Sequence, residues 1–322
     1  MPGREQRIGA LRLAETASGG EEFWIAASDE TWLHGRCVAS RQSWGMARRR
    51  GSTLMASDLR DDAMVVRCRE AATSAAAQLR GVSALSRIVT RVTSEEGDVQ
   101  VETTVVLTRS SMSLVTTTDH WMEDDQLLLR LATPEPRESI PSDLPLLWCH
   151  GSAAVLLHEA AGHAAEHGAA TASWPPWLRV MDRSRSGAAD LLHGETPRAT
   201  RRQSFVDVPL PRMTAVVVEH SSAPFDLPDE HIEVLLIGGG AYDPVTDEVT
   251  IHVAASRAVR ALTARSLQPF TLRAPRRLVA ASLRGAAGPA ERYPGVICSR
   301  EGQELFVSSE APQLLTAALP LA

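Results

Sequence analysis

Two histidines and a glutamate stand close together in the segment "LLHEAAGHAAEHG", at His158, Glu159 and His163. Their order is that of the H-E-x-x-H zinc motif of metallopeptidases, with one additional residue before the second histidine. On a regular helix, residues four apart differ by about 40° around the axis and residues five apart by about 140°. His158 and His163 would therefore face different directions on an undistorted helix.

A local widening of the helix would remove this conflict. A single i→i+5 turn, or π-bulge, rotates less per residue and returns a five-residue spacing toward one face. Gly162 lowers the backbone cost of such a distortion. The spacing alone leaves two alternatives: a metal site on a helix that is widened at Ala160–Gly162, or the polar face of an ordinary alanine-rich helix.

The overall composition limits which other chemistry the chain can perform. All 33 basic residues are arginine, so no lysine can form a Schiff base or serve a phosphate-binding loop. The four cysteines are widely spaced, which argues against a disulfide framework and a zinc ribbon: Cys37, Cys68, Cys149 and Cys298. A net charge of −6 without a dense basic stripe argues against nucleic acid as a partner. Because no stretch reaches the roughly 18 apolar residues of a membrane span, we expect a soluble, cytoplasmic protein without a membrane partner.

The residue pattern predicts an α+β fold of mainly antiparallel sheets with packed helices, in two domains. Residues 22–57 suggest short strands and turns, 58–81 one capped helix, and 86–121 antiparallel strands with alternating Val and Thr. A proline-rich linker is expected at 132–145. We therefore expect an N-terminal α+β domain at 1–140 and a C-terminal domain at 141–322.

The C-terminal domain is expected to hold the histidine-bearing helix, and after it an irregular segment at 171–200. A hairpin is expected at 233–260, preceded by a loop of three glycines, Gly238, Gly239 and Gly240. The last predicted turn and strand contain Cys298.

Several separate segments are similar to motifs of the TldD/PmbA family. "LLHEAAGHAAE" resembles the H-E-A-x-G-H-x-x-E signature, and "RRQSFVDVPLPRMT" resembles the segment R-R-x-S-Y/F-x-x-x-P-x-P-R-M-T. "GVICSREGQELFV" resembles the near-terminal G-x-x-C-x-[KR]-[DE]-G-Q segment, and "IGGGAYD" resembles the F-G-G-G-Q-V-D loop. The chain is shorter than typical members, so the resemblance implies a shortened N-terminal domain and a shortened segment between Gly168 and Arg201.

The resemblance implies a zinc site with His158, His163 and Cys298 as ligands and one Zn2+ per chain. Three protein ligands leave the fourth tetrahedral position to water, as in catalytic zinc sites. Glu159 would take a proton from that water and deliver it to the leaving amine. The implied activity is that of a zinc metallopeptidase that hydrolyses amide bonds of unfolded or extended peptides, leader peptides included.

Other residues each have a functional and a structural interpretation. Glu166 aligns with the last acid of the signature, where it would orient a ligand histidine or be a solvated residue near the helix end. The three glycines would admit a substrate backbone or form the tight start of a strand. Arg212 and Arg202 would hold a peptide carboxylate or carbonyl, or would only brace the proline turn.

Four further residues near the motif match no ligand position of the family. We therefore assign surface or core roles to His150, His167, His193 and Cys149. Cys37 and Cys68 are expected to be small buried side chains.

The alternative function is that of a non-catalytic partner or scaffold subunit in a TldD/TldE-like heterodimer. Such a subunit lacks the metal motif, whereas this chain keeps both histidines, the glutamate and the cysteine. The resemblance implies a homodimer, or a heterodimer with a metal-free paralogue, that acts on a peptide or an unfolded protein. Gyrase modulation, which an older family name suggests, has no support from charge or motifs.

Overall fold

The structure is a computed structural model of the 322-residue chain. It describes residues 4–16, 20–33, 36–49, 85–95, 98–109, 112–132, 137–169, 172–184, 187–197, 200–201, 210–213, 215–221, 223–261 and 263–322, with the single residues Glu70, Ser74 and Gln78. These three residues are helical, and the rest of the helix predicted at 58–81 lies outside the described residues.

The chain divides into two compact units. The first comprises Met1–Arg130, Arg202–Pro209 and Ser299–Leu305, and the second comprises Leu131–Arg201, Leu210–Cys298 and Phe306–Ala322. The main division between the units falls between Arg130 and Leu131. The domain boundary predicted at residue 140 lies ten residues further along the chain and stays a prediction.

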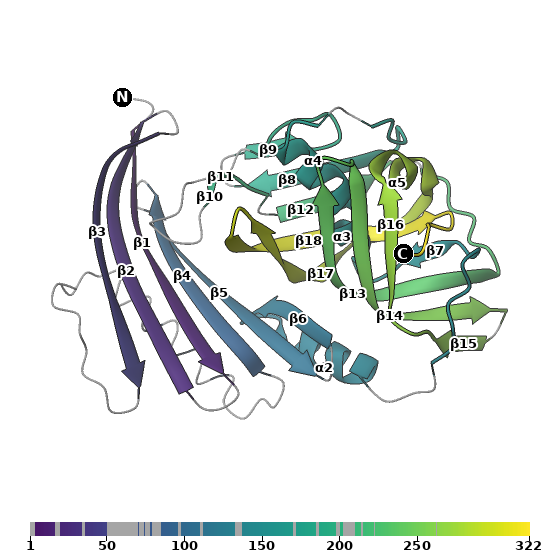
Figure 1. The fold of residues 1–322 in the computed structure, drawn as a ribbon, viewed down its shortest axis with the longest axis horizontal. Coiled ribbons are helices and arrows are strands. Elements are labelled where there is room, and N and C mark those ends of the chain that lie inside the picture. Colours follow the sequence, from purple (N-terminus) through teal and green to yellow (C-terminus); the bar gives the residue numbers. More distant parts are fainter. Residues whose placement is uncertain are drawn as a thin grey trace. The chain divides into compact units, whose positions relative to one another are not determined.

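A six-stranded sheet forms the first unit (Figure 1, purple to blue). Its order is β3-β2-β1-β4-β5-β6, and every pairing is antiparallel. The antiparallel strands that the Val/Thr alternation predicted are confirmed, with Val105, Leu107 and Leu114 buried on one face. The strands are β1 (Arg4–Thr16), β2 (Gly20–Leu33), β3 (Arg36–Arg49), β4 (Leu85–Glu95), β5 (Asp98–Arg109) and β6 (Met112–Thr117), and helix α2 (Trp121–Ala132) follows.

A ten-stranded sheet dominates the second unit (Figure 1, teal to yellow). Its path is β15-β14-β13-β7-β18-β12-β8-β9, with β16 beside β14 and β17 beside β18. Most pairings are antiparallel, but β13 with β7 and β12 with β18 are parallel. The strands are β7 (Leu146–Trp148), β8 (Leu178–Ser184), β9 (Gly187–Asp190), β12 (Ala215–His220), β13 (Glu230–Asp243), β14 (Glu248–Arg260), β15 (Thr263–Ser266), β16 (Phe270–Pro275), β17 (Leu283–Arg300) and β18 (Gln303–Thr316).

Three small elements also belong to the second unit. Strands β10 (Thr200–Arg201) and β11 (Leu210–Pro211) form a two-stranded sheet, and α5 (Arg276–Ser282) joins β16 to β17. The fold is therefore α+β and strand-dominated. None of the described helices is long and apolar enough to cross a membrane.

Two local predictions about the second unit are wrong. The segment predicted to be irregular at 171–200 contains the antiparallel pair β8 and β9, because buried side chains such as Val180 and Ala189 hold it to the sheet. The three glycines lie within β13 and do not form a loop before the hairpin. Register shifts at Val234/Leu236, Leu236/Ile237 and Ile237/Gly239 accommodate them in the β13–β14 ladder.

The histidine-bearing helix is the main helical element of the second unit. It runs continuously through α3 (Ala153–Leu157), η1 (His158–His163) and α4 (Ala164–Glu166). Every residue from 153 to 166 except His163 is buried, because alanine and leucine surround the helix axis. The helix contacts strands β12, β13 and β14. Because the sheet covers the helix, the polar side chains of the helix lie in the protein interior.

Candidate metal site

The predicted widening of the histidine-bearing helix is confirmed. The six residues from His158 to His163 form a single π-helical turn between the α-helical turns before and after it. As a result, the rings of His158 and His163 meet edge to face, with centroids 4.8 Å apart and planes at 90°. The extra residue of the motif therefore does not separate the two histidines.

Gly162 has a second role that sequence reasoning missed. A Cβ at this position would clash with the sulfur of Met213, the residue after Arg212. The glycine therefore lets the Met213 segment pack directly against the widened turn. No pattern in the sequence indicated that these two residues meet.

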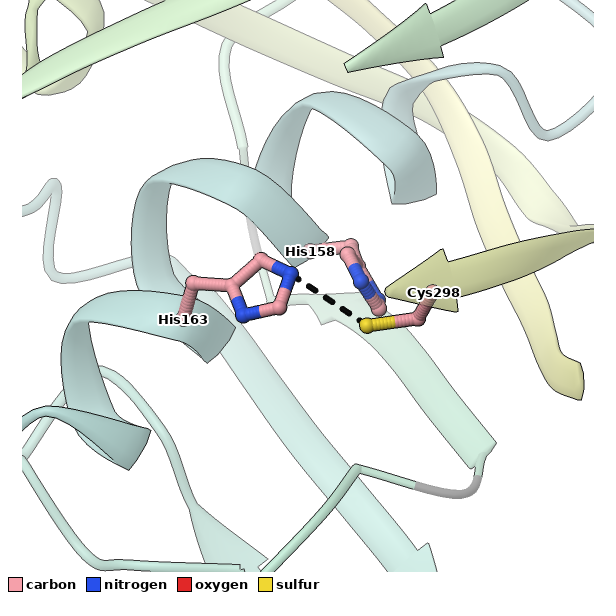
Figure 2. A group of neighbouring side chains, drawn as sticks. All are labelled: His158, His163 and Cys298. Atoms are coloured by element: carbon pink, nitrogen blue, oxygen red, sulfur yellow. Dashed lines mark hydrogen bonds between the residues drawn. The ribbon is translucent and has the colours of Figure 1, made fainter. Parts of the chain in front are cut away.

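Cys298 joins the two histidines from strand β17 (Figure 2). Its Sγ lies 3.3 Å from His163 Nε2, although 135 positions separate the two residues. A ring nitrogen of His158, a ring nitrogen of His163 and the sulfur of Cys298 all lie within 4.8 Å of one another. The three residues form a candidate metal site in which each offers a single ligand atom.

The donor set fits a zinc ion on two observations. First, His158 is only 1% exposed, yet neither of its ring nitrogens has a hydrogen-bond partner among the described residues. A buried ring without partners is unfavourable unless another group satisfies it. Second, zinc bonds of about 2.0–2.1 Å to nitrogen and about 2.3 Å to sulfur place a nitrogen ligand and a sulfur ligand about 3.5–3.6 Å apart in a tetrahedron. The 3.3 Å between Cys298 Sγ and His163 Nε2 is close to that separation, and the donor set, which lies within 4.8 Å, would tighten around a bound ion.

The electrostatics of the cluster favour a thiolate at Cys298. Burial alone would raise the pKa of this thiol, but the nearby His158 and His163 outweigh it and lower the pKa to about 5. The pKa of His163 is raised well above its usual value: burial opposes this, but Cys298, Glu166 and Glu159 outweigh it. The thiolate is the form of cysteine that binds a metal.

Glu159 lies beside the donor atom of His163. Its Oε2 lies 3.6 Å from His163 Nε2, and its side chain is largely buried. Burial raises the pKa of the carboxyl, against the attraction of both histidines. A Cβ on Gly240 would lie 2.7 Å from Glu159 Cγ, so the absence of a side chain at Gly240 makes room for this carboxylate.

Glu166 is buried and does not lie in solvent at the helix end. Its Oε2 is 2.9 Å from His163 Nδ1, and its Oε1 accepts a hydrogen bond of 3.0 Å from the Met213 backbone N–H. Burial raises the pKa of the carboxyl, but His163 and the Met213 N–H lower it below its usual value on balance. A carboxylate on one ring nitrogen leaves the other, Nε2, directed at the candidate site.

Arg212 is completely buried between Cys298 and Glu166. Its Nη2 donates hydrogen bonds of 2.7 Å to the Cys298 carbonyl and 3.1 Å to Cys298 Sγ. Its Nε lies 3.8 Å from Glu166 Oε1. With 0% of its side chain exposed, Arg212 does not face a substrate in this structure, contrary to one of its two sequence interpretations.

The structure does not bring the remaining predicted residues to the donor cluster. His150 and His193 are exposed and pair with Glu291 and Asp190. His167 is exposed and Cys149 is buried. Gly238 and Gly239 have only ordinary contacts around their Cβ positions, and their substrate role stays a prediction. Arg202 and the side chains of Cys37 and Cys68 lie outside the described residues.

Comparison with known proteins supports the fold but not a family assignment. The sequence matches no protein-family model, and no curated protein matches it. The crystal structure of TldE from Thermococcus kodakarensis superposes with a TM-score of 0.52 at 7% identity, covering 99% of this chain and 95% of that chain. A candidate modulator of DNA gyrase from Bacteroides thetaiotaomicron gives a TM-score of 0.45 at 10% identity, over 100% and 94%. The chain thus shares the fold of TldE, over nearly the whole of both chains, and the predicted shortening is not confirmed.

Proposed function

We propose that this chain is a zinc-dependent peptidase that hydrolyses amide bonds of unfolded or extended peptides. One observation carries the proposal: three atoms of types that bind metals gather within 4.8 Å on a widened helix and strand β17, with the Glu159 carboxylate 3.6 Å from one of them. The side chains are of the types that catalytic zinc sites use, and three protein ligands leave a position for a reactant.

His158, His163 and Cys298 would hold the metal through two ring nitrogens and one sulfur. When bound, zinc supplies a Lewis acid and lowers the pKa of a water molecule toward about 7. Glu166 fixes the ring of His163 through Nδ1 and so directs Nε2 toward the candidate site.

Glu159 is proposed as the general base and acid of the reaction. Its Oε2 would accept a proton as the water oxygen adds to the peptide carbonyl carbon, and would return a proton to the nitrogen as the C–N bond breaks. Burial raises the pKa of this carboxyl, which brings the group closer to the range in which it can both accept and release a proton. Gly240 keeps the volume into which the carboxylate projects.

The proposed substrate is a peptide or unfolded protein that adds as a strand to a sheet edge. Strand addition recognises the backbone, so it suits extended chains of varied sequence. We further propose that the protein works as a homodimer or with a metal-free paralogue. The similarity of its fold to TldE supports a partnership of this type.

Metal analysis tests the site. We expect about one zinc per chain in the wild-type protein and loss of that zinc in His163→Ala. The matched control is His150→Ala, which changes an exposed histidine with a carboxylate partner. A metal-free wild-type protein whose properties do not change in Cys298→Ala would contradict the proposal.

Peptide hydrolysis tests the role of Glu159. Glu159→Gln should keep its zinc but lose about 10²–10⁴-fold in kcat, measured by mass spectrometry on a mixture of unfolded peptides. Glu291→Gln, which changes a glutamate beside the surface residue His150, should keep full activity. A zinc-loaded wild-type protein that cleaves no peptide, alone or with a paralogue, would favour the non-catalytic partner subunit instead.

A further inference from the structure

Arg212 is a charged side chain that the proposed reaction does not use. It lies in the segment that follows β11, 86 positions before Cys298 in the chain, and its side chain is fully buried. Burial of a guanidinium is unfavourable unless anionic or hydrogen-bonding partners surround it. Its placement therefore requires an explanation in terms of the groups that it contacts.

The contacts of Arg212 join two supports of the candidate metal site. Nη2 contacts both the backbone carbonyl and the sulfur of Cys298, at 2.7 Å and 3.1 Å. On the other side, Nε lies 3.8 Å from Glu166, whose second oxygen is 2.9 Å from His163 Nδ1. One guanidinium thus connects a ligand on β17 with the carboxylate that orients a ligand on η1.

We propose that Arg212 is a positioning residue that fixes Cys298 and Glu166 for metal binding and draws electron density from the Cys298 sulfur. The inference rests on the zinc site of the proposed function. A hydrogen bond from a cation to a thiolate makes the sulfur a weaker donor, which leaves a bound metal more electron-poor. Lysine would not replace this residue, because an ammonium cannot reproduce the planar fork that meets the carbonyl, the sulfur and the carboxylate together.

The burial of Arg212 makes its contacts costly to lose. Without the guanidinium, the Cys298 carbonyl would lose its donor at 2.7 Å, and Glu166 Oε1 would lose the cation 3.8 Å away, both inside the protein. The segments that carry Cys298 and Glu166 would then be free to shift, which would move a group away from the candidate metal site.

Loading the full-length protein with Co2+ in place of zinc measures the effect of Arg212 on the donor strength of the Cys298 sulfur. In Co2+-loaded wild-type protein, Cys298 should produce a thiolate-to-cobalt charge-transfer band in the near ultraviolet. In Arg212→Gln the band should move to longer wavelength, because the sulfur becomes a stronger donor. Zinc affinity, measured by chelator competition, should fall by about 10–100-fold. Arg212→Lys should shift the band in the same direction by a smaller amount and weaken zinc binding by about tenfold.

Arg276→Gln is the matched control. Arg276 is also a buried arginine of the second unit with a carboxylate partner, Asp247, at 2.7 Å. Its variant should lower the melting temperature and leave both the band and the zinc affinity at wild-type values. The same pattern in Arg212→Gln would overturn the inference, because Arg212 would then only brace the chain.

Two further outcomes are decisive. If Arg212→Gln does not fold, Arg212→Lys decides: a wild-type band with wild-type affinity overturns the inference, and a shifted band with weaker binding supports it. If the wild-type protein itself shows no thiolate-to-cobalt band, the metal site of the proposed function fails, and the inference fails with it. A band that appears in the wild type but does not shift in either Arg212 variant contradicts the inference alone.

Discussion

Cys298 and Cys149 lie in the same unit of the protein and are both buried, at 5% exposure each, but their surroundings differ. Around Cys149, burial and the negative charge of Glu233 raise the pKa of the thiol to about 12. Around Cys298, two histidines overcome the effect of burial and lower the pKa to about 5. The difference shows that burial by itself does not decide whether a cysteine is an inert core residue or a thiolate. The charges that the fold places beside it decide.

The largest expected difference between the two cysteines concerns metal binding. Loss of a group that hydrogen-bonds a metal ligand weakens metal binding by about 10–100-fold. Cys298→Ser should weaken zinc binding by more than this, because it removes a ligand itself. Cys149→Ser should bind zinc as the wild type does. Chelator competition measures both affinities. Equal zinc binding by the two variants would remove the distinction between the two sites.

Alkylation of the zinc-depleted protein should show a second, smaller difference. At pH 7 Cys298 is a thiolate and Cys149 is a thiol. The small thiolate fraction of Cys149 is intrinsically the better nucleophile, because its pKa is higher. The two effects together should make alkylation about 10² times faster at Cys298 than at Cys149. From pH 6 to pH 8 the rate at Cys298 should stay nearly constant, because its pKa of about 5 lies below that range. The rate at Cys149 should rise about tenfold per pH unit. Peptide mapping after iodoacetamide treatment measures each rate. Faster alkylation of Cys149 would contradict the conclusion that Cys298 is the thiolate and Cys149 the thiol.

A substitution at Gly240 tests whether the site needs space as well as charge. Gly240→Ala would place a Cβ 2.7 Å from Glu159 Cγ, so the carboxylate must move. Displacement by about 1 Å can cost about 10²-fold in rate, so kcat on an unfolded peptide should fall by up to that factor while zinc stays bound. The neighbouring Gly239→Ala leaves Glu159 in place, because its Cβ would meet only His252, at 3.9 Å. A fall in kcat in that variant would instead support the predicted contact of this stretch with substrate. Equal activity of the two variants would show that Glu159 does not depend on this space.

The smallest expected effect is on thermal stability. A ligand at about 100 times its dissociation constant stabilises the folded state by about 2.7 kcal/mol. Removing zinc with a chelator should therefore lower the melting temperature by several degrees in the wild type and in Cys149→Ser. Cys298→Ser should show almost no change, because it has little zinc to lose. Differential scanning calorimetry measures all three, and a chelator effect in Cys298→Ser as large as in the wild type would contradict this expectation.

Local patterns predicted the elements that depend on local periodicity. The alternation of Val and Thr predicted the antiparallel strands β4, β5 and β6, and the hairpin of β13 and β14 was also predicted. Predictions failed where the sheet overrides local preference. Strands β8 and β9 form in a segment rich in Ser, Arg and Gly because neighbouring strands supply their hydrogen bonds, and the three glycines stay in β13 through register shifts.

The sequence by itself determined that His158 and His163 can bind one metal ion only if the helix widens between them, because residues five apart do not share one face of a regular helix. The π-helical turn satisfies that requirement. Only the tertiary structure decided which residues surround the pair. Cys298 and Arg212 meet although 86 positions separate them, and Gly240 opens space for Glu159, because the order of strands in the sheet, and not the distance along the chain, sets which segments become neighbours.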